Sequence, residues 1–275
     1  MKKRLSLCIP AVALTLAAVS PVAEATAPNT NNEWVPQASN AALAEQSESQ
    51  AMTMMAATKS KQRTNAVSYA TKLSFNPKKH TITTYFTIKK ITGKAPQKFY
   101  FNLNLRTSTK KNGKTKSFAT MKDSLTTKEI KAKRTITRTY KVKSTKFWRY
   151  RLVTKSYWSR YASTPSRTTW SASVLANKKA QPYPIFYNRY TKEKMSVPNS
   201  ASYKKLAKKK QIKPGNYRNN FIKYHDRKFG RANWKGVSVF HMLPLAYGGN
   251  NHMNNLYALP TGLYKTHVAS WWKGY

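Results

Sequence analysis

A long stretch of alternating residues, from 66 to 160, most constrains the fold of this chain. Aromatic and β-branched side chains recur there at every second position, and turn residues separate the runs. Alternation with a period of two is typical of strands that bury one face. The clearest run extends from Phe99 to Leu105 and is followed by Asn112-Gly113. An Asn-Gly pair between two such runs is a strong hairpin signal.

The spacing of these runs predicts about six or seven antiparallel strands, which favours a β-sandwich of the immunoglobulin-like or fibronectin-like type over residues 61–162. The predicted strands begin near Val67, Ile82, Phe99, Ser117, Thr135 and Trp148. Lysine and threonine fill the outward positions, which also protects strand edges. Together with helices expected later in the chain, the overall class is α+β.

Charge is distributed very unevenly along the sequence. Of the 51 Lys and Arg residues, all but Lys2, Lys3 and Arg4 lie beyond residue 58, whereas four of the eight acidic residues precede it. Self-repulsion on this scale destabilises a compact fold, so a polyanionic partner is expected. Nucleic acid and anionic cell-wall polymers both fit, because phosphate contacts are independent of base sequence.

The N-terminus has the pattern of a secretory signal. Residues 1–25 begin with three cations, continue through an uncharged apolar stretch and reach Ala23-Glu24-Ala25, a small-x-small cleavage site. Cleavage near Ala25 would release a secreted, extracellular protein and remove Cys8, the only cysteine. No later segment is long and apolar enough to span a bilayer. Residues 26–60 are polar and lack periodicity, so they are expected to form a disordered, propeptide-like linker.

Two further regions lead to the C-terminus. Residues 163–200 contain several prolines and no sustained period, which predicts a linker or surface loops. Residues 201–275 are expected to form a second domain. A short, very basic helix is predicted from Ser202 to Lys210, and a second helix from Asn216 to Gly230. His225-Asp226 on that helix is interpreted as a capping or surface pair, with a ligand pair as the alternative.

The segment after residue 236 has a strand-loop-strand-helix pattern. Val237 to Phe240 alternate as a strand that places His241 at its end, and Gly248-Gly249 supply backbone freedom for an open loop. A second strand is predicted from Asn255 to Leu259, followed by a helix from about Leu263 to Trp272. On that helix Tyr264, His267 and Trp271 are spaced to share one face.

This segment resembles the HNH, or His-metal finger, endonucleases. The resemblance covers about the last 60 residues. It rests on residues at fixed spacing: Val239, His241, Pro244, Leu245, Tyr247, Gly248, Gly249, Asn251, Asn255, Leu256, Leu259, Pro260, Trp271, Trp272 and Tyr275. The resemblance implies a ββα finger in which His241 is the general base and Asn255 helps to hold the finger. It further implies a divalent metal, such as Mg²⁺, Mn²⁺, Zn²⁺ or Ni²⁺, beside the scissile phosphate.

The sequence also departs from the family at ligand positions. Phe240 stands where the family has a first histidine or aspartate, and Tyr264 stands where the helix usually supplies a ligand histidine. His252 replaces a common aspartate. His267 lies three positions after Tyr264 and is the nearest histidine that could substitute for it.

Three interpretations follow. In the first, His241 remains the base, and His267, with Asn254 or Asn255 and His252, forms a reduced metal site. In the second, the finger is inactive and binds nucleic acid or cell wall as a cationic module. In the third, His241 is structural and the protein is an adhesin. The first predicts a secreted nuclease acting on DNA or RNA. The predicted phosphate contacts are Arg231, Lys235, Lys265 and Lys273.

Overall fold

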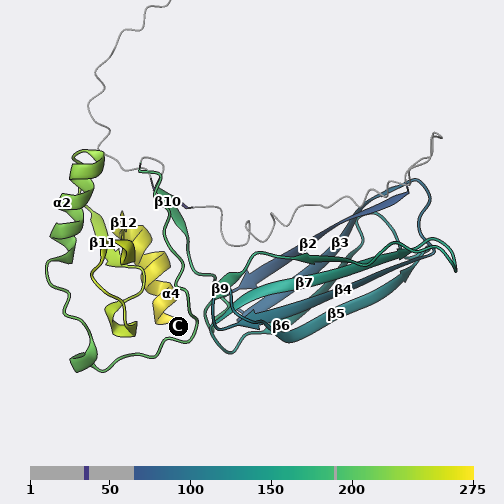
Figure 1. The fold of residues 1–275 in the computed structure, drawn as a ribbon, viewed down its shortest axis with the longest axis horizontal. Coiled ribbons are helices and arrows are strands. Elements are labelled where there is room, and N and C mark those ends of the chain that lie inside the picture. Colours follow the sequence, from purple (N-terminus) through teal and green to yellow (C-terminus); the bar gives the residue numbers. More distant parts are fainter. Residues whose placement is uncertain (1–33, 37–64, 189–190) are drawn as a thin grey trace, which may run out of the picture. The chain divides into compact units, whose positions relative to one another are not determined.

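The computed structural model describes residues 34–36, 65–188 and 191–275, which belong to one compact unit. The predicted signal peptide and most of the predicted linker lie outside these residues. The described part is mostly antiparallel β-sheet with few helices, which confirms a β-rich α+β fold. Figure 1 shows long strands in one region and the helices near the C-terminus. None of the helices in the described ranges combines the length and apolarity needed to cross a bilayer.

Two antiparallel sheets form the β-rich region, and the six strands from β2 to β7 match the predicted runs. The first has the order β2-β3-β6, with β2 at Ala66–Asn76, β3 at Thr81–Thr92 and β6 at Thr135–Lys141. The second has the order β5-β4-β7-β8, and β9 also pairs with β7. The strands of this second sheet are β4 (Lys98–Ser108), β5 (Lys116–Thr126), β7 (Lys146–Tyr157), β8 (Arg167–Trp170) and β9 (Val174–Ala176).

A shared apolar core joins the two sheets. The alternate residues from Phe99 to Leu105 are fully buried, and the rings of Phe86 and Phe101 stack with centroids 4.1 Å apart. Phe86 belongs to the first sheet and Phe101 to the second, so the sheets pack face to face. The period-two pattern thus arises because each strand contributes one face to this core.

Residues 163–200 contain more regular structure than the predicted linker or loops. Strands β8 and β9 extend the second sheet, and β10 (Phe186–Asn188) pairs with β1 (Trp34–Pro36). These strands are only three or four residues long, which is too short for alternation to be visible in the sequence.

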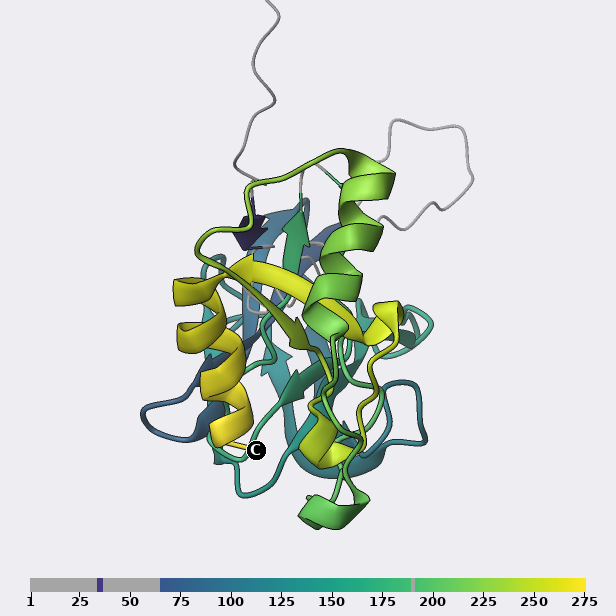
Figure 2. The same cartoon turned by 90° about the vertical axis from the view of Figure 1, so that its left-hand side faces the viewer.

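The C-terminal region is built on a hairpin of β11 (Val237–His241) and β12 (Leu256–Pro260), as predicted. Helix α2 (Tyr217–Phe229) packs on one face, against Val239, Leu256 and Ala258. The C-terminal helical segment packs on the other face, against Phe240, Tyr257 and Leu259. Figure 2 shows the hairpin with these helices. Because both faces are covered, the strand sequence Leu256–Pro260 is almost continuously apolar.

The C-terminal helical segment changes its winding along its length. It consists of α3 (Thr261–Leu263), a π-helical section η4 (Tyr264–Ala269) and α4 (Ser270–Lys273). The predicted common face of Tyr264, His267 and Trp271 is wrong, because His267 is exposed while Trp271 is fully buried. A π-helical section turns through a smaller angle per residue than an α-helix, so α-helical spacing no longer places these side chains together.

The predicted helix from Ser202 to Lys210 is also wrong. Only the 3-10 turn η1 (Lys208–Lys210) forms there. Residues 202–210 include five lysines, and no residue of η1 is buried. Repulsion between the lysines is therefore not offset by burial of an apolar helix face. The second predicted helix is confirmed as α2, although the Asn216 side chain makes no cap hydrogen bond.

Candidate functional site

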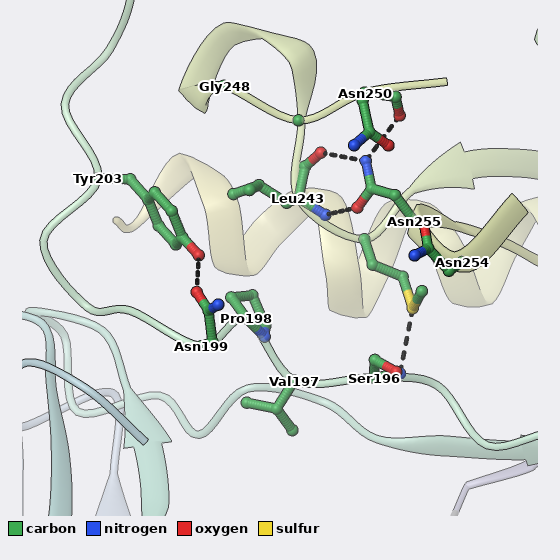
Figure 3. A pocket seen from close by; sticks show the side chains of 12 residues that line it. Ser196, Val197, Pro198, Asn199, Tyr203, Leu243, Gly248, Asn250, Asn254 and Asn255 are labelled. Atoms are coloured by element: carbon green, nitrogen blue, oxygen red, sulfur yellow. Dashed lines mark hydrogen bonds between the residues drawn. The ribbon is translucent and has the colours of Figure 1, made fainter. Parts of the chain in front are cut away.

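Asn255 holds the loop that connects the two strands of the hairpin. Its Oδ1 accepts a hydrogen bond from the Leu243 amide at 2.9 Å. Its Nδ2 donates to the carbonyl oxygens of Leu243 and Asn250, at 3.0 and 2.8 Å. Figure 3 shows these bonds beside a pocket of about 240 Å³ lined by the same loop. Asn255 therefore positions the loop, as the resemblance implies.

The loop also depends on its two glycines. Gly248 has φ +87°, a left-handed conformation that L side chains rarely adopt. A Cβ atom on Gly249 would overlap the carbonyl oxygen of Leu243. The Gly249 amide donates to the Pro244 carbonyl at 3.1 Å, which closes the turn. The Gly-Gly pair is thus required by backbone conformation at one position and by close approach at the other.

His241 lies at the end of β11, where it is half-buried. Its Nε2 is 2.8 Å from Oδ1 of Asn251. Nδ2 of Asn251 donates to the Lys213 carbonyl at 2.9 Å, which fixes the orientation of this amide. The ring of Tyr217 covers the imidazole, with centroids 4.4 Å apart. Asn251 matches the HNH pattern, but the sequence suggested no role for this residue.

This network defines the protonation of His241. Since Oδ1 of Asn251 can only accept, Nε2 of His241 carries the hydrogen, and in the neutral ring Nδ1 has the lone pair. Burial lowers the pKa of His241 below its ordinary value, and the hydrogen bond that Nε2 donates to Asn251 opposes this only in part. The neutral imidazole is therefore favoured near pH 7, which is the form that can accept a proton.

A groove of about 740 Å³ opens beside His241. Lys205, Arg218 and Lys273 contribute cations to its lining, and none of the described residues that line it has a carboxylate side chain. The Arg218 guanidinium donates to the carbonyl oxygens of Val237 and Trp234, at 2.8 and 3.4 Å, so it is fixed to the backbone. The remaining lining is largely apolar and includes five aromatic side chains, which are Tyr217, Phe240, Tyr247, Tyr264 and Trp272. The groove thus suits an anion that also carries flat groups.

Phe240 and Tyr264 lie together in this groove. Their rings stack with centroids 4.7 Å apart and an interplanar angle of 26°. These are the two positions where the resemblance implies metal ligands. A phenyl ring cannot coordinate a cation, and burial raises the pKa of the Tyr264 hydroxyl, so it does not readily become a phenolate. The residues at these positions do not fit a metal ion.

The substitute ligands predicted from sequence lie elsewhere. His252, Asn254 and His267 do not line the His241 groove in the described structure. His267 is exposed, and its Nδ1 lies 2.8 Å from Thr266 Oγ1 and 3.2 Å from the Leu263 carbonyl oxygen. His252 and Asn254 are exposed on the loop. Within residues 65–188 and 191–275, no three His, Cys, Asp or Glu side chains gather as a metal site.

Most of the predicted phosphate contacts also lie outside the groove. Arg231, Lys235, Lys265 and Lys273 are all exposed, but of these four only Lys273 lines the groove. Lys205 and Arg218 were not predicted. Arg218 follows Tyr217 at the start of α2, so its place in the groove depends on how that helix packs against β11, which the sequence pattern does not specify.

His225 and Asp226 have structural roles. The interpretation of His225 as a surface residue is wrong, because it is 2% exposed and its ring contacts those of Phe221, Phe229 and Trp234. Asp226 Oδ1 accepts hydrogen bonds from the Ala232 amide and Trp234 Nε1, at 3.2 and 2.9 Å. The pair therefore anchors the turn after α2 and does not face the groove.

Comparison of the chain with protein-family models, with curated proteins and with solved structures gives no match.

Proposed function

We propose that the segment from about residue 217 to the C-terminus is a finger of the HNH type that binds nucleic acid along the His241 groove. We further propose that His241 acts as the general base in phosphodiester cleavage. The observation that supports this most directly is the fixed tautomer of His241. Nδ1, the unprotonated nitrogen, belongs to a ring that lines the groove, where the described residues supply three cations and no carboxylate.

The chemistry follows from these groups. His241 Nδ1 would take a proton from the attacking water, whose oxygen forms a bond to phosphorus as the bond to the leaving oxygen breaks. The charge that develops on the phosphate oxygens would be offset by Lys205, Arg218 and Lys273. Arg218 is held by backbone carbonyls, so its charge is positioned before substrate binds. A proton from a groove lysine or from water would neutralise the leaving oxygen.

A divalent ion has no place in these steps. The resemblance implies a metal, but the stacked pair of Phe240 and Tyr264 occupies the positions that would hold it. The predicted Mg²⁺, Mn²⁺, Zn²⁺ or Ni²⁺ therefore stays a prediction that the groove residues do not favour.

The same stacked pair supports a second candidate function. If cleavage in this fold requires the ion, the finger would be a catalytically inactive, cationic module that binds nucleic acid or anionic cell wall. The 48 cations beyond residue 58 serve either function, because non-specific phosphate binding needs only positive charge.

One experiment separates the two candidates. Purified protein is incubated with plasmid DNA and with RNA, with each divalent ion or with chelator, beside His241→Ala and the exposed loop control His252→Ala. We expect cleavage that falls about 100-fold or more in His241→Ala and is unchanged in His252→Ala. Retardation of nucleic acid without strand breaks in every condition would leave only the binding module. Cleavage that occurs only with a divalent ion would show that the predicted metal takes part in the reaction.

Two wider features belong to the same proposal. The face-to-face packing of the two sheets supports an immunoglobulin-like sandwich for the β-rich region. Export and an extracellular location rest on the sequence of residues 1–25. The protein would then meet nucleic acid or cell-wall polymers outside the producing cell.

A further inference from the structure

The five-stranded sheet has an outer face that the core does not use. On β4 the residues from Tyr100 to Arg106 that alternate with the buried ones point away from the core, and on β7 the same is true of Arg149, Arg151 and Lys155. Trp170 of β8 stands opposite Arg151 in the strand register. We call this surface the Arg-Trp face, defined by Asn104, Arg106, Arg149, Arg151, Lys155 and Trp170.

Two arginines share one tryptophan on this face. Arg106 and Arg149 are direct cross-strand partners, and their guanidinium carbons lie 5.9 and 4.4 Å from the Trp170 ring centroid. The indole is 43% exposed, so the cations do not cover it. A second cation and ring pair, Lys155 and Tyr157, lies 4.9 Å apart farther along β7.

The Arg106 side chain is held in place by its neighbours. Its Nε donates to Thr115 Oγ1 at 2.9 Å, Nη2 donates to the Thr115 carbonyl at 2.8 Å, and Nη1 donates to Asn104 Oδ1 at 3.1 Å. The guanidinium therefore keeps one orientation without an anion. Arg149 differs, because its Nε is buried with no hydrogen-bond acceptor in the described part of the chain.

No acidic residue in the described structure neutralises these arginines. Asp123 is in register with the buried Phe101, so it belongs to the opposite face of the sheet. The other acids have partners of their own, with Glu129 beside Arg134, Glu193 beside Lys228, and Asp226 bonded to Trp234. Like charges directly opposite each other destabilise a sheet, and an external anion would offset that repulsion.

We propose that the Arg-Trp face binds single-stranded nucleic acid, at a site separate from the His241 groove. Guanidinium groups match phosphate in geometry, and an exposed indole offers a platform for a base. Stacking on a side chain requires a base that is not already stacked in a helix, which selects single strands over duplexes. A polymer of phosphates without rings would satisfy the arginines but would gain nothing from Trp170.

The test measures binding of the full chain to a fluorescent oligothymidylate of about 20 nucleotides, in the wild type and in His241→Ala, which lacks the proposed base and so leaves the oligonucleotide uncut. The variants are Trp170→Ala, Trp170→Tyr and Arg149→Gln. The control, Lys90→Gln, removes one exposed cation from β3 in the other sheet. Thermal unfolding confirms that each variant is folded. A duplex of equal length and a linear polyphosphate are compared as ligands.

We expect Trp170→Ala and Arg149→Gln to weaken oligothymidylate binding about tenfold, and Trp170→Tyr to restore most of the loss. Lys90→Gln should change it less than about twofold. Equal affinity of Trp170→Ala and the wild type for the oligonucleotide would overturn the proposal. The proposal would also be overturned if only Arg149→Gln lost affinity and if the loss were equally large for polyphosphate. The ligand would then be a polyanion without rings. The same measurements in His241→Ala separate this face from the groove, since the Trp170 effect should persist there.

Discussion

Nε2 of His241 lies 2.8 Å from Oδ1 of Asn251, an amide whose orientation is fixed by the Lys213 carbonyl. The contact determines which imidazole nitrogen is free, so Asn251 is a positioning residue for the proposed base. It also provides a way to change the pKa of His241 without altering the ring.

Asn251→Asp should raise the pKa of His241, because a carboxylate beside Nε2 stabilises the imidazolium. The acidic limb of any cleavage profile should move to higher pH by about one unit or more. NMR titration of the His241 ring protons measures the shift independently of activity. Asn112→Asp, which adds the same charge in the turn between β4 and β5, should leave the titration unchanged. An unshifted His241 in Asn251→Asp would contradict the proposed contact.

Phe240→His combined with Tyr264→His should create a metal site in the groove. The stacked rings place these positions close enough for two imidazoles to share one ion. Isothermal titration with Zn²⁺ or Ni²⁺ should show one bound ion per chain in the double variant, and no such site in Phe240→Ala with Tyr264→Ala. If the folded double variant gains no ion, the two positions do not correspond to ligand positions of the HNH finger.

Gly249→Ala should lower the free energy of unfolding by about 1–3 kcal/mol, because the added methyl group overlaps the Leu243 carbonyl in a packed turn. Gly262→Ala is a matched control. Its Cβ would meet nothing within 4 Å, so stability should be unchanged or slightly higher. Urea unfolding of both variants makes the comparison, and equal midpoints would count against the close approach at Gly249.

Asn255→Ala should cost about 2–4 kcal/mol of stability, since three hydrogen bonds are lost and the loop carbonyls lose their donor. Asn254→Ala, at the exposed neighbouring position, should change stability by less than about 0.5 kcal/mol. Similar losses in both variants would show that the loop does not depend on Asn255.

Acidification should destabilise the protein through His225. Burial lowers its pKa in the folded state, so between that pKa and the unfolded value near about 6.5 the unfolded chain binds more protons. The stabilisation is complete above about pH 6.5 and is lost as the pH falls. His225→Phe should therefore reduce the fall in Tm between pH 7.5 and pH 5, whereas the exposed His252→Gln should not. A wild-type Tm that does not fall between pH 7.5 and pH 5 would contradict the predicted loss of stability on acidification.

The sequence predicted the long strands because their physics is local. Each run from Val67 onward contributes alternate side chains to one core, so a period of two is visible within about five residues. The hairpin around His241 was predicted from the alternation of Val237 to Phe240 and from the Gly248-Gly249 loop, and the resemblance to the HNH finger implied the same arrangement. The short strands β8 and β9 were missed because their place depends on pairing with β7.

The site was predicted less completely than the fold. His241 and Asn255 were named because of the resemblance to the HNH pattern, and the structure gives both a defined position. The displacement of His267 depends on a π-helical section, and the burial of His225 depends on contacts with Trp234 beyond the helix. Neither effect follows from residue type or from regular helical spacing.

The contacts of Trp271 limit where the chain can be cut to make a recombinant C-terminal fragment. Nε1 of Trp271 donates to the Gln181 carbonyl at 2.8 Å, its own carbonyl accepts from Asn177 Nδ2 at 3.0 Å, and its ring packs edge-on against Tyr183. All three partners precede residue 201. A recombinant fragment cut where the sequence places the second domain would strip this indole of its surroundings, so a usable fragment has to begin before Asn177.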